Sequence, residues 1–140
     1  MNYEVVKQDL IRHEALRLTP YICSSDKLTI GVGRNISESG LGLTEDEIEY
    51  LLINDIKRCN QELTNNFKWY LELNRARQYA MVNLCFNLGL PTLFKFKNAL
   101  KSMEAGLFDE AADHFLDSRW ARQVGDRAIE ITSTIRTGKL

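Results

Sequence analysis

The sequence lacks a hydrophobic run long enough to span a bilayer, and it lacks an excess of charge of one sign. Its 18 Lys and Arg residues are interspersed with 19 Asp and Glu residues, for a formal net charge of -1. This balance does not indicate a basic face that binds nucleic acid. The first ten residues, MNYEVVKQDL, carry several charged side chains and no apolar core. We therefore expect no secretory signal and synthesis in a cytoplasm.

Cysteine is also scarce. The three cysteines, Cys23, Cys59 and Cys85, are odd in number, and their spacing matches no zinc-binding pattern. We expect free thiols, no disulfide framework and no metal site. A chain of 140 residues, 44% of them hydrophobic, is long enough to bury one core or to form two small lobes around a groove. One compact domain over 1–140 is the expected organisation.

Hydrophobic spacing predicts a mostly helical chain. An amphipathic helix is expected to run to about residue 12, and a second helix begins at the capping box of Thr44 and Glu47 and extends over about 44–64. A third helix, over about 75–88, is apolar almost all round and should be the buried centre of a helical lobe. Shorter helices are predicted over about 93–105, 109–117 and 126–135.

The stretch LTPYICSSDKLTIGVG has a different pattern. Turn residues follow Cys23, and apolar residues then alternate with Thr29, Gly31 and Gly33, which predicts a short β-hairpin. The two glycines indicate that the strand bends there or that another group approaches its backbone closely. We therefore expect an α+β, mostly α fold. Its parts are a hairpin lobe over about 13–43, a connecting helix over about 44–64, and a helical lobe over about 65–140 that includes the N-terminal helix.

Glu14 is a candidate general acid. It falls at the C-terminal end of the first predicted helix, where the helix dipole disfavours an anion, and apolar Leu16 and Leu18 would desolvate it. Both effects raise the pKa of a carboxyl group, which is what a general acid needs near neutral pH. The alternative is an exposed surface glutamate beside Arg12 and Arg17.

Cys23 has three interpretations. It can be a small hydrophobic residue packed in the hairpin, which is the commonest role of a free cysteine. It can be a nucleophile paired with His13, as in thiol hydrolases. It can also replace a carboxylate that faces Glu14 across a cleft. The residues alone leave all three open.

The second half of the chain holds His114 and most of the aromatic side chains. His114 can line a groove or serve a structural role in its helix. An aromatic side chain at a groove wall suits a sugar ring, but we expect most of this group to pack in the core of the helical lobe. The group consists of Tyr79, Phe86, Phe94, Phe96 and Trp120.

Six segments, in order, carry a resemblance to a known family: RHEALRLTPY, LTIGVGR, GLTEDEI, RARQYAMVNLCFNLG, FDEAADHFLDSRWARQ and STIRTGKL. With these segments the chain resembles the bacteriophage lysozymes of the T-even type, the muramidases of glycoside hydrolase family 24. The active-site signature of that family is Glu, eight residues, Asp or Cys, five residues, Thr. Here it reads Glu14, Cys23 and Thr29. The resemblance implies a lysozyme-like fold with an active-site cleft between two lobes.

The resemblance also implies an activity, hydrolysis of the β-1,4 bond between N-acetylmuramic acid and N-acetylglucosamine in peptidoglycan, without a cofactor. Glu14 would protonate the glycosidic oxygen, with Cys23 and Thr29 near the attacking water. Cys23 would hold or activate that water, or its thiolate would attack the anomeric carbon and give net retention. Because the usual Asp is missing, the alternative is a catalytically weak peptidoglycan-binding module of the same fold.

Further positions carry over from the resemblance. Substrate-binding positions are Asn35, Phe86, His114 and Gln123, and Arg127 matches an arginine that pairs with the catalytic glutamate. Ala99 stands where the family more usually has a small hydroxyl side chain, and Arg34 stands in place of a common histidine. The resemblance further implies a monomer that stays in the host cytoplasm until a membrane-permeabilising holin gives it access to the periplasmic cell wall.

Overall fold

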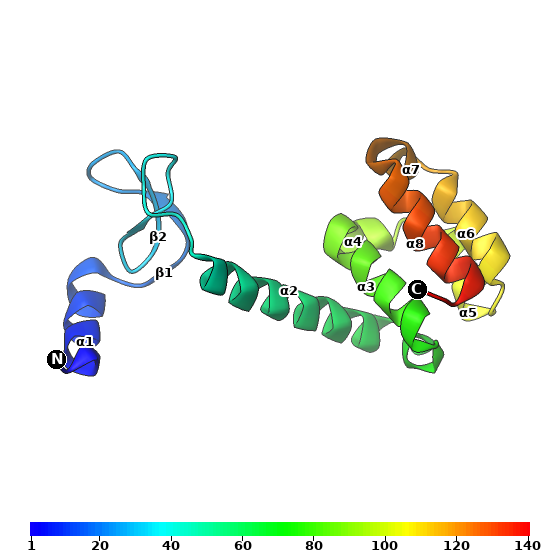
Figure 1. Ribbon diagram of the computed structural model, residues 1–140, viewed down its shortest axis with the longest axis horizontal. Helices are drawn as coiled ribbons and strands as arrows, with labels where there is room; N and C mark the ends of the chain where they lie inside the picture. Colours follow the sequence, from blue (N-terminus) through cyan, green and yellow to red (C-terminus); the bar gives the residue numbers. More distant parts are fainter. The chain divides into compact units, whose positions relative to one another are not determined.

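The computed structural model describes all 140 residues as a mostly helical chain with one small antiparallel sheet (Figure 1). Residues 1–50 and 51–140 form two compact units. The first holds α1 (Tyr3–Glu14), β1 (Arg17–Ile22), β2 (Leu28–Gly31), β3 (Arg34–Asn35) and the start of α2 (Glu45–Asn66). The second holds the rest of α2, a short 3-10 helix η1 (Tyr70–Glu72), α3 (Arg75–Leu88), α4 (Leu90–Leu93), α5 (Lys97–Glu104), α6 (Phe108–Leu116), α7 (Arg119–Val124) and α8 (Asp126–Thr137).

The sheet has the strand order β1-β2-β3, so the predicted hairpin gains a short third strand. Thr29 lies on the central strand, opposite Tyr21 on β1 and Asn35 on β3. It is the one buried side chain of residues 1–50. Gly31 and Gly33 have φ of 68° and 70°, values that favour glycine, and they turn the chain between β2 and β3. The predicted bend at these glycines is confirmed.

Helix α1 extends two residues beyond its predicted end near residue 12, to Glu14. Its N-terminus is capped by Asn2, whose side chain accepts a hydrogen bond from the Val5 N–H. At the other end, the N–H of Ala15 donates to the carbonyl of Ile11 at 2.9 Å. Ala15 has a φ of 61°, which an L-residue rarely adopts, so the chain turns sharply after Glu14.

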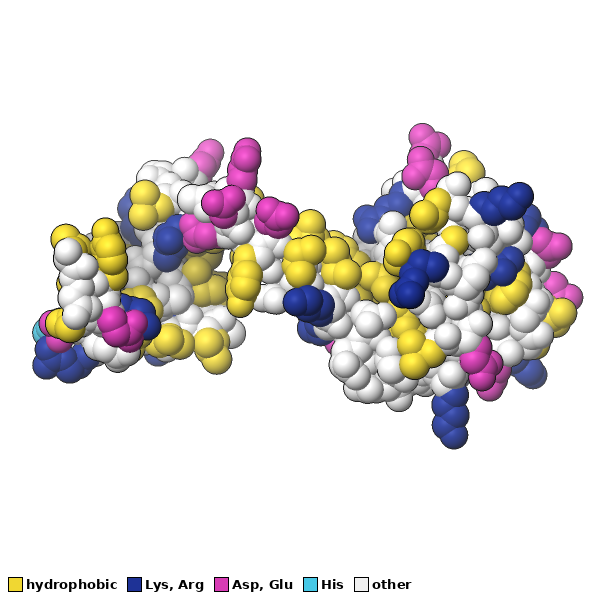
Figure 2. Space-filling model, turned by 60° about the horizontal axis from the view of Figure 1, so that its bottom comes forward, with side chains coloured by type: hydrophobic (Ala, Val, Ile, Leu, Met, Phe, Trp, Pro, Cys, Tyr) yellow, Lys and Arg dark blue, Asp and Glu magenta, His cyan; other side chains and the backbone are white.

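Helix α2 begins at the predicted capping box. The Glu47 N–H donates to the Thr44 hydroxyl at 3.2 Å, and the Thr44 N–H donates to the Glu47 carboxylate at 3.3 Å. Only Cys59 and Leu63 of this helix are buried, and Figure 2 shows hydrophobic side chains on its surface. No helix of the structure, α2 included, has the length and apolar character needed to cross a membrane.

The core of residues 51–140 lies among helices α3, α5, α6 and α8. Helix α8 packs on α3 and α6, and α5 packs on α6 (Figure 1). Helix α3 has its predicted bounds and contributes four buried side chains, although its remaining faces are less buried than expected. The largest fully buried side chains include Tyr70, Phe115, Leu63, Met81, Leu84, Leu93, Met103 and Ile135. Burial of each such side chain stabilises the unit by roughly 1.5–3 kcal/mol.

Two predictions for the helical part were wrong in detail, and one helix was missed. The helix expected over 93–105 begins only at Lys97, as α5, because Phe96 takes a non-helical backbone conformation (φ -82°, ψ 58°), and the separate short helix α4 ends at Leu93. Helix α7 was not predicted, and it begins where the Ser118 side chain accepts a hydrogen bond from the Ala121 N–H. Of the expected core aromatics, Trp120 is buried and Phe96 is partly buried. The other three are exposed: Tyr79, Phe86 and Phe94.

Candidate active site

Glu14, the candidate acid, ends α1 and lies against the turn between β2 and β3. A Cβ built on Gly33 would lie 3.2 Å from Oε2 of Glu14 and 3.4 Å from its Cδ. A side chain at position 33 would therefore crowd the carboxylate, which would have to shift by a few tenths of an ångström. The positive φ of Gly33 makes a side chain unfavourable there for a second reason.

The expected desolvation of Glu14 by its neighbours is wrong. Leu16 and Leu18 are both exposed, and so is Glu14. Leu16, just before β1, and Leu18, within it, both face solvent and do not cover the carboxylate. The position of Glu14 therefore depends on the helix end and the glycine turn, and not on an apolar pocket around the acid.

Cys23 follows β1 and opens the turn that leads into β2. Its N–H donates to the carbonyl oxygen of Lys27 at 2.9 Å, and its own carbonyl accepts from the Asp26 N–H at 2.9 Å. Asp26 has a φ of 61°, a left-handed conformation that Asp tolerates better than most residues. The turn therefore fixes the backbone on both sides of the thiol, which is half-buried.

Hydrogen bonds lower the pKa of the Cys23 thiol below its ordinary value. The largest contribution comes from the Lys27 backbone, followed by the Thr29 hydroxyl and the Ser25 backbone. The Thr29 hydroxyl also donates to the carbonyl oxygen of Lys27 at 2.9 Å. Since a hydroxyl has one proton, the carbonyl and the thiolate compete for it. The structure thus brings Cys23 and Thr29 together at one carbonyl oxygen, that of Lys27, which accepts from the Cys23 N–H and from the Thr29 hydroxyl.

His13 does not form the pair with Cys23 that a thiol hydrolase would need. It lies in the last turn of α1 and is exposed, and its side chain makes no hydrogen bond. A nucleophilic thiol of that class needs a base within hydrogen-bond reach. The structure therefore gives no support to a Cys23–His13 dyad.

Asn35, a predicted substrate contact, is held firmly by its own loop. Its side-chain oxygen accepts hydrogen bonds from the N–H and the hydroxyl of Ser37, and its carbonyl accepts from the Gly42 N–H. A Cβ on Gly40 would collide with both oxygens of Asn35. The NH₂ group of Asn35 has no partner, so it is the part of the side chain that is free to bind a ligand.

Arg34, next to Asn35, is hydrogen-bonded to residues just before and at the start of α2. One guanidinium nitrogen donates to the carbonyl of Gly42 at 3.0 Å and to the carboxylate of Glu47 at 3.1 Å. The positive charge expected at this position is therefore paired. It ties β3 to the capping box of α2.

Phe86 and Arg127 line one groove of about 560 Å³ in residues 51–140. Phe86 lies on α3 and Arg127 on α8, and apolar side chains such as Tyr79 and Val82 complete the wall. Arg127 is oriented by Asn83, whose side-chain oxygen accepts from Nε at 3.1 Å and from Nη2 at 2.7 Å. The sequence did not indicate Asn83 as a partner of Arg127, because its position along the chain does not distinguish it from other polar residues of a helix.

His114 and Ala99 line a second hollow, of about 340 Å³. Lys95, Lys97 and Asp117 also line it. Two positions that the sequence resemblance singled out separately therefore come together. Gln123 lies exposed on α7 and lines neither hollow.

The predicted site residues thus fall into two sets. Glu14, Cys23, Thr29 and Asn35 belong to residues 1–50, and Phe86, His114, Gln123 and Arg127 belong to residues 51–140. The expected pairing of Arg127 with Glu14 joins the two sets and stays a prediction.

Three relatives of known name share about a third of their aligned residues with this chain. It is 32% identical to the pre-baseplate central spike protein Gp5 of Enterobacteria phage T4 over 78% of this chain and 20% of that protein. It is 30% identical to the probable T4-type lysozyme 1 of Dictyostelium discoideum over 70% of this chain and 59% of that protein. It is 31% identical to the endolysin of Acyrthosiphon pisum secondary endosymbiont phage 1 over 79% of this chain and 73% of that protein.

The chain therefore spans a fifth of the spike protein and about three fifths of the Dictyostelium protein. A family model described as phage lysozyme matches residues 11–134, which is most of the chain. The match begins before Glu14 and ends within α8, so it includes all the predicted site residues. The chain belongs to the phage lysozyme family.

Proposed function

We propose that the chain is an endolysin muramidase, which hydrolyses the β-1,4 bond between N-acetylmuramic acid and N-acetylglucosamine in peptidoglycan. The observation that carries this proposal is that the Cys23 N–H and the buried Thr29 hydroxyl both donate to the carbonyl oxygen of Lys27, in the same unit as Glu14. By the resemblance, these three residues stand at the positions of the active-site signature, and they lie within the stretch that the phage lysozyme family model matches. The names of two relatives, a lysozyme and an endolysin, support the same activity.

Glu14 is proposed as the general acid. Its protonated carboxyl group donates a proton to the glycosidic oxygen while the bond from that oxygen to the anomeric carbon breaks. The carboxylate lies beside the Gly33 backbone, where no side chain hinders a sugar from approaching.

Cys23 is proposed to activate the water. The water oxygen bonds to the anomeric carbon from the face opposite the acid, and its proton passes to the Cys23 thiolate, which gives inversion. The lowered pKa of Cys23 supports this role, because it increases the thiolate fraction near neutral pH. When Cys23 ionises, the Thr29 hydroxyl turns its proton from the Lys27 carbonyl to the thiolate. Asn35, Phe86, His114 and Gln123 are proposed to contact the glycan strand.

Replacing the acid tests the activity. Glu14→Gln keeps the size of the side chain and removes its ionisable proton, so hydrolysis should fall by about a hundredfold to ten-thousandfold. Glu4→Gln is the matched control, because Glu4 lies on the same helix and is exposed. Reducing-sugar release from purified peptidoglycan measures both variants. Equal activity of the two would contradict the proposed role of Glu14.

The configuration of the first product tests the role of Cys23. NMR of the newly formed reducing end should show the inverted anomer. The retained anomer would mean instead that the Cys23 thiolate attacks carbon and forms a covalent intermediate.

A second candidate, a catalytically weak peptidoglycan-binding module, is favoured by one observation, the cysteine at position 23. A thiol is a poorer base than a carboxylate at neutral pH unless its pKa is lowered. A binder would sediment with cell walls without releasing reducing sugar. Cys23→Asp would then create activity that the natural chain lacks.

We also propose where the chain acts. As an endolysin it would stay in the host cytoplasm and reach the periplasmic wall after a holin opens the membrane. Expression in a bacterial host with and without a membrane-permeabilising protein tests this dependence, since lysis should follow only when both are present.

A further inference from the structure

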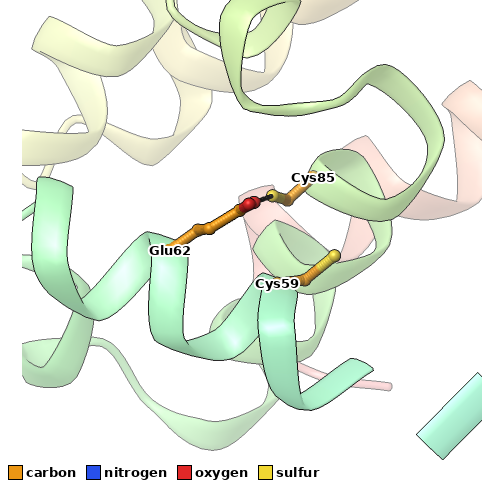
Figure 3. Close-up of side chains that lie close together, drawn as sticks. All are labelled: Cys59, Glu62 and Cys85. Carbon is orange, nitrogen blue, oxygen red and sulfur yellow. Dashed lines mark hydrogen bonds between the residues drawn. The ribbon is translucent and has the colours of Figure 1, made fainter. Parts of the chain in front are cut away.

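Two cysteines and a glutamate that the proposed hydrolysis does not use converge between α2 and α3 (Figure 3). Cys59 and Glu62 lie one turn apart on α2, and Cys85 faces them from α3. One ligand atom from each residue lies within 4.8 Å of the other two. Cys85 Sγ donates to Glu62 Oε2 at 3.5 Å.

The two sulfurs are inside the core, whereas the carboxylate reaches solvent. Cys59 and Cys85 are 0% and 1% exposed, and the side chain of Glu62 is 31% exposed. A carboxylate turned toward two buried thiols gives up part of its hydration for one weak S–H donor. Packing alone does not require a carboxylate at this position. The exposed side of Glu62 offers a path by which an ion can enter.

The spacing of the cluster fits a tetrahedral metal shell. Zinc binds thiolate sulfur at about 2.3 Å and carboxylate oxygen at about 2.0 Å, so the two ligand atoms are about 3.5 Å apart when the angle at the metal is tetrahedral. The separation of Cys85 Sγ and Glu62 Oε2 is 3.5 Å. The Cys59 sulfur lies within 4.8 Å of both the Cys85 sulfur and the Glu62 oxygen. A small movement of its side chain would therefore complete the tetrahedral arrangement.

Arg58 balances the charge of such a site. Two thiolates, one carboxylate and a divalent cation have a net charge of -1, and Arg58 Nη1 lies 3.4 Å from Oε1 of Glu62. The two carboxylate oxygens thus face different partners, Arg58 on one side and Cys85 on the other. A metal on Oε2 leaves the pair with Arg58 intact.

We propose that Cys59, Glu62 and Cys85 form a site for a thiophilic divalent cation, Zn²⁺ or Cd²⁺, with water as the fourth ligand. Binding forms two metal–sulfur bonds and one metal–oxygen bond and releases the two thiol protons to solvent. The ion fastens α2 to α3 and so stabilises residues 51–140. No atom of the site takes part in the proposed hydrolysis, so the role is structural.

The test titrates Cd²⁺ into the Cys23→Ser chain, kept reduced with a phosphine, so that only the two core thiols remain. The ultraviolet band of cadmium–thiolate charge transfer should saturate at one ion per chain, and Zn²⁺ should compete for the site. The thermal midpoint should rise with the metal concentration. Absence of the band in folded, reduced protein overturns the proposal.

Variants locate the ion. Cys85→Ser should remove most of the band, and Glu62→Gln should weaken Cd²⁺ binding at least about tenfold, the cost usual even for an outer partner of a metal site. Asp55→Asn is the matched control, since Asp55 also pairs with Arg58 on α2 but lies outside the cluster. Because Glu62→Gln keeps both thiols and a half-buried side chain, it tests the site even where Cys85→Ser unfolds. Equal affinity of Glu62→Gln and Asp55→Asn would contradict the proposed ligand set.

Discussion

The carboxylate of Glu14 lies so close to the backbone of Gly33 that a Cβ there would be 3.2 Å from Oε2. The end of α1 and the turn between β2 and β3 therefore meet at the candidate acid. Ala15, with its φ of 61°, supplies the sharp turn that directs the chain away from the helix at this point. The missing side chain at Gly33 leaves room for the carboxylate in this position.

Gly33→Ala should therefore lower activity as well as stability. Its methyl group would push the Glu14 carboxylate by a few tenths of an ångström, and because a shift of about 1 Å can cost roughly a hundredfold in rate, we expect a smaller loss of rate than that. The backbone strain should cost about 1–3 kcal/mol of unfolding free energy. Reducing-sugar release and urea unfolding measure the two effects.

Gly31→Ala is the matched control for this substitution. Gly31 has nearly the same φ, 68°, but a Cβ there meets nothing within 4 Å. We expect similar destabilisation without the loss of rate. If both variants lose activity equally, strain in the turn is responsible and the contact with Glu14 is not.

The Cys23 thiol should react at a lower pH than an ordinary cysteine. Hydrogen bonds from the Lys27 backbone and the Thr29 hydroxyl lower the pKa of this thiol, so its thiolate fraction at a given pH is larger. An unperturbed cysteine titrates at about 8.5. The rate of iodoacetamide labelling, followed by peptide mass spectrometry, should therefore rise with pH with a midpoint below that value. Cys59 and Cys85 are buried and should stay unlabelled while the chain is folded.

Variants of Thr29 test which hydrogen bond lowers the pKa of the Cys23 thiol. Thr29→Val removes the hydroxyl donor and should move the labelling midpoint of Cys23 upward, whereas Thr29→Ser keeps the donor and should leave it nearly unchanged. Because Thr29 is buried, circular dichroism must first show that each variant is folded. An unchanged midpoint in folded Thr29→Val would assign the shift to the backbone alone.

Much of the fold was predictable from local signals. The capping box of Thr44 and Glu47 marked the start of α2, and the glycine after Leu88 marked the end of α3. The division between α4 and α5 was not predictable, because Phe96 leaves the helical conformation without a proline or glycine to signal it. Helix α7 was missed because its 6 residues are too few to show a helical repeat of hydrophobic side chains.

The site was predictable only in part, for a related reason. The spacing of Glu14, Cys23 and Thr29 follows the chain, so a sequence motif can carry it. The contact between Arg127 and Asn83 joins α8 to α3, and the cluster of Cys59 and Cys85 joins α2 to α3. Such contacts depend on helix packing, which leaves no fixed spacing in the sequence.

Phe115→Ala should be among the most destabilising changes in residues 51–140. Phe115 is 0% exposed, and its ring lies 5.3 Å from that of Phe96. Loss of a buried phenylalanine costs about 3–5 kcal/mol, because a cavity replaces the ring. Both tryptophans, Trp69 and Trp120, belong to this unit, so their fluorescence during urea unfolding reports on it.

Leu116→Ala controls for the truncation itself. Leu116 is the next residue of α6 but is 37% exposed. Its loss should cost much less than that of Phe115. Comparable losses would mean that the core does not lie on the α6 face that carries Phe115.

Glu47→Gln should destabilise the chain at neutral pH and not in acid. Hydrogen bonds with the backbone and the hydroxyl of Thr44, followed by the Arg34 guanidinium, lower the pKa of Glu47 in the folded state. A carboxyl whose folded pKa is lowered adds stability above its unfolded value of 4.5, and this contribution is lost as pH falls through the folded pKa. The difference in thermal midpoint between the natural chain and Glu47→Gln should therefore shrink below pH 4.5. Glu49→Gln is the control, because Glu49 is an exposed carboxylate on α2 that makes no side-chain hydrogen bond or ion pair. Its difference in thermal midpoint from the natural chain should not shrink in this way. A constant difference for Glu47→Gln at all pH values would mean that its charge contributes nothing to the start of α2.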